Sequence, residues 1–319
     1  MMAASFGGQH MANKIPVGGS LARAYGFAFG NIVNNFGVTW MVVAIGWVLG
    51  YFFQQRYMGA VTSLQSRDPQ AIMQAMPFFW ACFAGIFVLM TAEIAALTKE
   101  ALGLRTGSAF LQFPFGAAMW RLIGAYLLYF LVMIVIYVIF AVVSLVLGGV
   151  GGAVVESARV GATTPLFALL FLLAALVAVG AIIYIATRLS FLLTPVAVAE
   201  RISLTRAWQL TKGNFWRIFV IVLALVIPLV VLELVFLVYV VRMPLVPPLH
   251  SGVTPQELQA FAEQQQAMNR QMMTDMQRYW YIAYPLSLVV SLIFYGMFAG
   301  ASAHAYRAVT HEDRAPEQF

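Results

Sequence analysis

Two carboxylates stand inside long apolar stretches of this chain and are the residues best suited to chemistry within a membrane. Glu233 lies deep in the stretch Ile218–Val241, and Glu93 lies near the end of Pro77–Leu97. A charge at the centre of a bilayer costs about 2.5–3.5 kcal/mol even on a lenient insertion scale. Glu233 is expected to bind a proton or ligand inside a helical bundle, or else to be a neutral carboxyl hydrogen-bonded to a neighbouring helix. Glu93 is expected either to be a similar site or to reach toward Lys99.

The densest run of basic residues, which also holds two tryptophans, is a second group of candidates. Near an anionic leaflet each basic residue contributes roughly 1 kcal/mol of attraction. The run fits a site for lipid headgroups or a protein partner, and equally the ordinary positive charge that sets membrane topology. Glu200 is expected to pair with Arg201 or Arg188. The run comprises Arg188, Arg201, Arg206, Trp208, Lys212, Trp216 and Arg217.

Residue types needed for catalysis or metal binding are few and scattered. Cys82 is the single cysteine and lies in an apolar stretch, which favours a packing role. The four histidines have no metal-ligand spacing, and no Ser-His-Asp or paired-carboxylate pattern occurs. The stretch Gly148–Gly152 lacks the ending of a phosphate-binding loop and is predicted to be a flexible connector. We expect no catalytic residue, metal or cofactor, so an enzyme is the least favoured class.

The elements that position these residues are apolar stretches of transmembrane length. Of the 319 residues, 62% are hydrophobic and only 9% are charged, whereas a soluble domain carries about 25% charged residues. A transmembrane helix needs about 20 mostly apolar residues. The sequence therefore predicts an all-α integral membrane protein with six spans, at Phe36–Phe53, Pro77–Leu97, Leu122–Leu147, Pro165–Thr187, Ile218–Val241 and Trp280–Ala303.

The uneven distribution of cations predicts the orientation of these spans. Twelve of the 18 lysines and arginines fall in segments on one side, which is expected to be cytoplasmic. An even number of spans then places both termini there, in a bacterial inner membrane. The net charge of +6 reflects this bias and indicates anionic lipid headgroups, not nucleic acid, as partners. The predicted parts are a tail over 1–19, a membrane domain over 20–306 and a second tail over 307–319.

Two stretches that precede the first and fifth spans resemble each other. Ser20–Tyr25 is followed by Gly30-Asn31, and Ser203–Trp208 is followed by Gly213-Asn214 at the same offset. In both, helical spacing gathers apolar and aromatic residues on one face. This pattern predicts short amphipathic helices in the cytoplasmic interface with that face toward the acyl chains, although each stretch can equally lengthen the span that follows.

Prolines in the predicted outer loops add a second mark of repetition. Asp68-Pro69, Thr164-Pro165 and Thr254-Pro255 each fit the start of a helix. These marks predict three copies of a unit with one interfacial helix and two spans, the middle copy being interrupted by Pro114. Duplication that merely built a bundle gives the same pattern. The units lie at about 20–98, 105–187 and 203–306.

Two further features concern packing. Gly46 with Gly50 and Gly296 with Gly300 form pairs that let helices approach closely, either between these two spans or between two chains. The longest outer loop, Arg242–Arg278, contains a capping box followed by a helical pattern. That helix is expected to cover the bundle, to rest on the membrane or to receive a protein partner.

A stretch of about thirty residues combines a span that ends in arginine, a proline, an acidic residue and a helix of the type Ser-Trp-x-Leu-Thr-x-Gly. It resembles the membrane domain of bacterial glycerophosphoryl diester phosphodiesterases and related uncharacterised six-span envelope proteins, although alanine precedes the tryptophan here. In fused relatives the chemistry belongs to a separate soluble barrel, so the resemblance implies a lipid or envelope context without catalysis. The residues are Arg188, Phe191, Pro195, Glu200, Ser203, Ala207, Trp208, Leu210, Thr211, Gly213, Trp216 and Arg217.

Two classes of function are consistent with these features. The first is a non-catalytic membrane module that binds lipid or a protein partner and supports envelope processes. The second is a small transporter or lipid-translocating protein whose pathway passes Glu233. The repeated interfacial stretches and basic rim favour the first class, and the intramembrane acid favours the second.

Overall fold

The described residues of the computed structural model are almost all helical, and no strand occurs among them. The structure describes residues 14–65, 69–105, 110, 115–157, 163–199, 202–239 and 255–310. The helices in these ranges are α1 (Val17–Gly30), α2 (Ile32–Gln65), α3 (Pro69–Ala101), α4 (Ala117–Ser157), α5 (Thr163–Ala199), α6 (Leu204–Leu210), α7 (Phe215–Tyr239) and α8 (Pro255–Thr310).

Within this part of the chain, six helices are long and apolar enough to cross a membrane, which confirms the predicted all-α fold with six potential spans. The prolines mark helix starts as expected for α3 at Pro69 and α8 at Pro255, while α5 starts slightly before Pro165. Proline suits a first turn because its missing N–H has no partner there anyway. The candidate spans are Ile32–Phe52, Met76–Ala101, Ala117–Ile139, Leu172–Ala199, Phe215–Leu232 and Pro285–Thr310.

Two predicted connections are continuous helix instead. Helix α4 passes through Gly148–Gly152 and ends at Ser157, so the prediction of a flexible connector there is wrong. Extending an existing helix adds one hydrogen bond for each residue that is fixed, and this outweighs the low helix propensity of glycine. Helix α8 is also unbroken over its 56 residues, with Pro285 inside it. The outer helix and the sixth span are therefore one element.

The helices form an inner and an outer group. The inner helices α3, α5 and α8 contact one another. Each outer helix contacts two inner ones: α2 lies against α3 and α8, α4 against α5 and α3, and α7 against α8 and α5. The short helices add to this arrangement, because α1 packs on α8 and α6 packs on α5.

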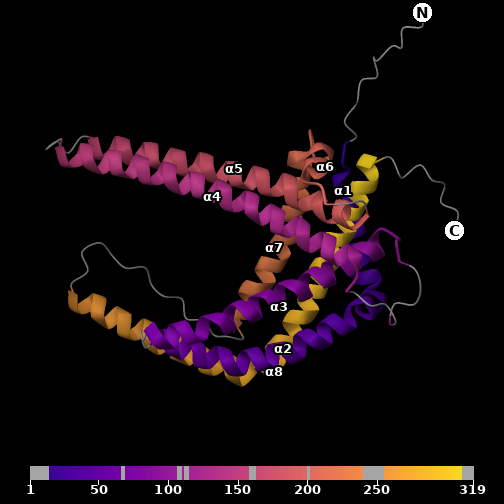
Figure 1. The fold of residues 1–319 in the computed structure, drawn as a ribbon, viewed down its shortest axis with the longest axis horizontal. Helices are drawn as coiled ribbons and strands as arrows, with labels where there is room; N and C mark the ends of the chain where they lie inside the picture. Colours follow the sequence, from indigo (N-terminus) through magenta and orange to yellow (C-terminus); the bar gives the residue numbers. More distant parts are fainter. Residues whose placement is uncertain are drawn as a thin grey trace, which may run out of the picture.

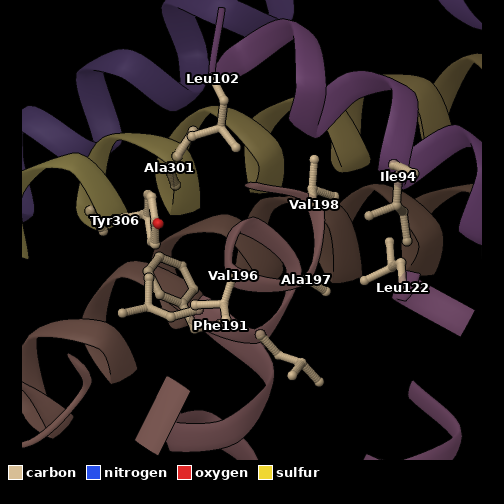
Figure 2. Close-up of a cluster of buried hydrophobic side chains, with 14 of the residues drawn as sticks. Ile94, Leu102, Leu122, Phe191, Val196, Ala197, Val198, Ala301 and Tyr306 are labelled. Atoms are coloured by element: carbon tan, nitrogen blue, oxygen red, sulfur yellow. The ribbon is translucent and has the colours of Figure 1, made fainter. Parts of the chain in front are cut away.

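Buried side chains gather at one end of the molecule, here called the packed end, which holds residues 89–98, 187–198 and 292–306 of the inner helices. Figure 2 shows part of its apolar core, where Phe191, Val196 and Tyr306 meet. Away from this end the α4–α5 hairpin projects from α2, α3 and α8 (Figure 1). Helix α4 has 41 residues, which at 1.5 Å per residue is about 60 Å, twice the hydrocarbon thickness of about 30 Å.

Candidate functional site at the packed end

The site is built around the short helix α6, which the local sequence delimits at both ends. The hydroxyl oxygen of Ser203 accepts a hydrogen bond from the backbone N–H of Arg206 at 3.1 Å and caps the helix. The turn that follows contains Gly213 with a φ of 78°, a left-handed conformation that favours glycine. Helix α7 then begins at Phe215. The stretch is thus a separate helix and does not simply lengthen the span.

Arg188 of α5 lies under this helix and links the two elements. Its guanidinium donates from Nη2 to the carbonyl of Trp208 at 2.7 Å, from Nη1 to the hydroxyl of Tyr184 at 2.9 Å and from Nε to the hydroxyl of Thr211 at 3.3 Å. The same group lies 3.7 Å from the centre of the Trp208 ring. Arg188 is only 5% exposed. This corrects the expected headgroup role of Arg188, because all three nitrogens bind protein groups.

The remaining members of the basic run differ in how exposed they are. Arg217 is half-buried and donates from Nη1 to the carbonyl of Ile15 at 2.9 Å. Arg206 and Lys212 are exposed, and Trp216 is 72% exposed. The predicted Arg201 and its neighbour Glu200 lie outside the described residues. The structure therefore leaves an exposed surface of Arg206, Lys212 and Trp216, here called the exposed rim.

The apolar face of α6 also differs from the prediction. Ala207 and Thr211 are fully buried, and Trp208 packs edge-to-face on Tyr184 of α5. That face therefore meets the neighbouring span instead of the acyl chains, because α6 lies against α5. In α1 the buried residues are likewise Ser20, Ala24 and Ala28, on the side that packs against α8.

Close approach of α1 to α8 explains one of the glycine pairs. A β-carbon at Gly300 would lie 2.9 Å from the β-carbon of Phe27, and one at Gly296 would lie 3.6 Å from Ala28. The nearest neighbours of this pair are therefore in α1, with Asn35 at the start of α2, and not at Gly46 and Gly50. The pair on α8 therefore lets α1 approach closely, while α2 and α8, which carry the two predicted spans, are also in contact.

Residues at the starts of the outer helices hold distant segments of backbone in place. Besides the bond from Arg217 to Ile15, Arg121 of α4 donates from Nη2 to the carbonyl of Val198 at 3.0 Å. At the start of α2, Asn34 donates to a carboxylate oxygen of Glu100 at 2.6 Å. In the sequence, the one sign of this role is the Trp-Arg pair that occurs at both 120–121 and 216–217.

The intramembrane acid Glu93 is buried inside the bundle and is 5% exposed. Its Oε1 has no hydrogen-bond partner within the described part of the chain. Tyr295 of α8 interacts electrostatically with Glu93 and with Tyr126 of α4. The hydroxyl oxygen of Tyr126 lies 3.1 Å from the hydroxyl oxygen of Thr194 of α5. The expected reach toward Lys99 is therefore corrected. Glu233 lies in α7, but its side chain is outside the described structure.

Metal-ligating side chains are the remaining class of candidate site residues. No group of three or more His, Cys, Asp or Glu that could hold a metal occurs among them. Comparison with known protein families, curated proteins and solved structures finds no match to this chain. The assignment of function therefore rests on the geometry of the packed end.

Proposed function

We propose that the protein is a non-catalytic module of a bacterial inner membrane that binds anionic lipids at its cytoplasmic face. The observation that carries the proposal is the exposed rim, where Arg206 lies on α6, Lys212 in the turn that follows and the exposed indole of Trp216 at the start of α7. Tryptophan is enriched at the membrane–water interface, and each cation near an anionic surface contributes roughly 1 kcal/mol. A surface of this composition suits a lipid phosphate.

The proposed orientation places the packed end on the cytoplasmic side, with both termini there. Gly19 of α1 lies opposite His304 near the end of α8, so the first and last described helices share this end. Twelve of the 18 lysines and arginines fall in segments on the side assigned to it, and excess Lys and Arg is typical of cytoplasmic loops. Helices α1 and α6 then lie at the cytoplasmic ends of the spans.

We also propose that three repeated units, about 20–98, 105–187 and 203–306, form a closed ring. The contacts support this cyclic order, since each outer helix packs on the inner helix of its own unit and on that of the preceding one. The outer helix of the first unit, α2, packs on α8 of the last unit, and this contact closes the ring. Each short helix packs on the inner helix of the preceding unit, α1 on α8 and α6 on α5.

Side chains give independent support for the ring. Arg121 and Arg217 begin the outer helices of successive units, and each binds a carbonyl in the segment leading into the next unit, at Val198 and Ile15. Asn34 begins the first outer helix and binds Glu100 in the segment leading into the second unit. Burial also coincides at the offset of the sequence repeat, for the pairs Ala24 and Ala207, Val38 and Ile221, and Val42 and Leu225.

The proposal is tested by removing the two cations of the exposed rim. The double variant Arg206→Gln/Lys212→Gln loses about 2 kcal/mol of electrostatic attraction, so we expect phosphatidylglycerol to bind about 30-fold more weakly. Binding is measured by titrating the purified full chain in mild detergent and following bound lipid by native mass spectrometry. The variant Arg206→Lys/Lys212→Arg keeps both charges and serves as the control. Equal affinity in the wild type and the double Gln variant would refute the proposal.

A further inference from the structure

An open apolar groove lies between α2 and α8, away from the exposed rim. Its volume is about 760 Å³, within the range of about 300–1,000 Å³ that is usual for small-molecule sites. The walls bear only apolar and aromatic side chains. They include Phe36, Trp40 and Trp47 from α2 and Leu288, Val289 and Leu292 from α8.

Phe110, which follows α3 in the chain, closes part of this groove. The indole N–H of Trp40 donates to the carbonyl of Phe110 at 3.1 Å, and the Phe110 side chain joins the lining. Pro285 of α8 lines it as well. The indole nitrogen is thereby satisfied by the protein, so the groove offers an occupant shape and apolar surface and no polar anchor.

The groove lies where α2, near the beginning of the chain, meets α8, near its end. In the ring of helices, α2 and α8 are neighbours in space but are far apart in the sequence. The two walls of the groove therefore belong to helices that do not follow one another in the chain.

We infer that this groove binds an acyl chain of a membrane phospholipid. Apart from Phe110, its lining belongs to the candidate spans Ile32–Phe52 and Pro285–Thr310, so its open side faces the region that hydrocarbon chains occupy. Continuity with the lipid-facing surface supports the same occupant, because Trp47 and Val289 are nearly half exposed. Since no charged side chain lines the groove, the site selects for the chain and not for the headgroup. It is therefore distinct from the exposed rim.

The test fills the groove and counts retained lipid. Ala44 lines the groove, whereas Ala84 is exposed on α3. Ala44→Trp and Ala84→Trp therefore add the same side-chain volume, the first inside the groove and the second outside it. The full chain is purified from nanodiscs of dioleoyl phosphatidylcholine, delipidated in mild detergent and examined by native mass spectrometry. We expect one phosphatidylcholine to stay bound to the wild type and to Ala84→Trp, and at least tenfold less occupancy in Ala44→Trp.

Several outcomes overturn the inference. It fails if the wild type retains no lipid, if detergent alone occupies the site, or if Ala44→Trp retains as much lipid as Ala84→Trp. If Ala44→Trp does not fold, Leu288→Trp blocks the groove from the other wall and decides the same question. Because phosphatidylcholine is zwitterionic, Arg206→Gln/Lys212→Gln is expected to keep the groove lipid. Loss of that lipid in this variant would assign it to the exposed rim and refute the groove site.

Discussion

Replacement of Arg188 by methionine tests whether the contact between α5 and α6 is structural. Methionine keeps much of the side-chain length but removes the three hydrogen bonds to Tyr184, Trp208 and Thr211 and the contact with the Trp208 ring. Among the described residues the guanidinium pairs with no carboxylate, so neutral groups alone stabilise it. The substitution therefore removes donors without leaving an unpaired buried acid.

The expected loss follows from these contacts. Hydrogen bonds that involve a charged group contribute about 1.5–3 kcal/mol each, and a cation over an aromatic ring contributes about 0.5–2 kcal/mol. Because such terms do not add, and burying the guanidinium itself carries a desolvation cost, we expect Arg188→Met to lower the free energy of unfolding by about 3–5 kcal/mol. The free energy of unfolding of Arg188→Lys should lie between those of the wild type and Arg188→Met, since an ammonium group lacks the planar fork that reaches three partners.

Unfolding is measured by titrating sodium dodecyl sulfate into the protein in mixed micelles and following far-ultraviolet circular dichroism. Arg206→Met is the matched control, because Arg206 belongs to the same short helix but is exposed, and it should change stability by less than about 0.5 kcal/mol. If both methionine variants unfold at the wild-type concentration of dodecyl sulfate, Arg188 does not hold α6 against α5. A larger loss for Arg206→Met than for Arg188→Met would likewise contradict the assigned roles.

Two further predictions address the interior. Gly300→Val places a β-carbon 2.9 Å from the β-carbon of Phe27, so it should destabilise the protein by about 1–3 kcal/mol. Gly26→Val, where nothing lies within 4 Å, should change dodecyl sulfate unfolding far less, and equal losses would contradict close packing of α1 on α8. In liposomes, a lipid-binding module should give no pH-dependent flux, so the wild type, Glu93→Gln and Glu233→Gln should behave alike. A flux that either substitution abolishes would favour a transporter.

The six spans could be predicted because transmembrane length and apolar composition are local properties. Proline positions also located the starts of α3 and α8, since the reason for proline at a first turn lies within the turn itself. Gly148–Gly152 was mispredicted because glycine has a low helix propensity, whereas extending an existing helix adds a hydrogen bond for each residue that is fixed. The length of α4 therefore depends on cooperative growth from its apolar span as well as on local propensity.

The site was harder to predict because it depends on which helices become neighbours. Periodicity showed that Ala207 and Trp208 share a face, but it did not show that α5 covers this face. An arginine near the end of a span is most simply a topology signal, and only the packing of Trp208 over Arg188 reveals its structural role. The groove was beyond prediction for the same reason, since its walls come from the first and last spans.

The contacts of the N-terminal segment set an order for biosynthesis. Ile15 bonds to Asn214 and to Arg217, which lie 199 and 202 residues later in the chain. At about 5–20 residues per second, a ribosome needs roughly 10–40 s to supply these partners. The buried polar residues Ser20 and Asn35 stay uncovered still longer, because α8, which packs on α1 and α2, is made after these partners. A nascent chain that stalls before α8 is complete thus leaves these polar residues of α1 and α2 exposed to the quality-control machinery of the membrane.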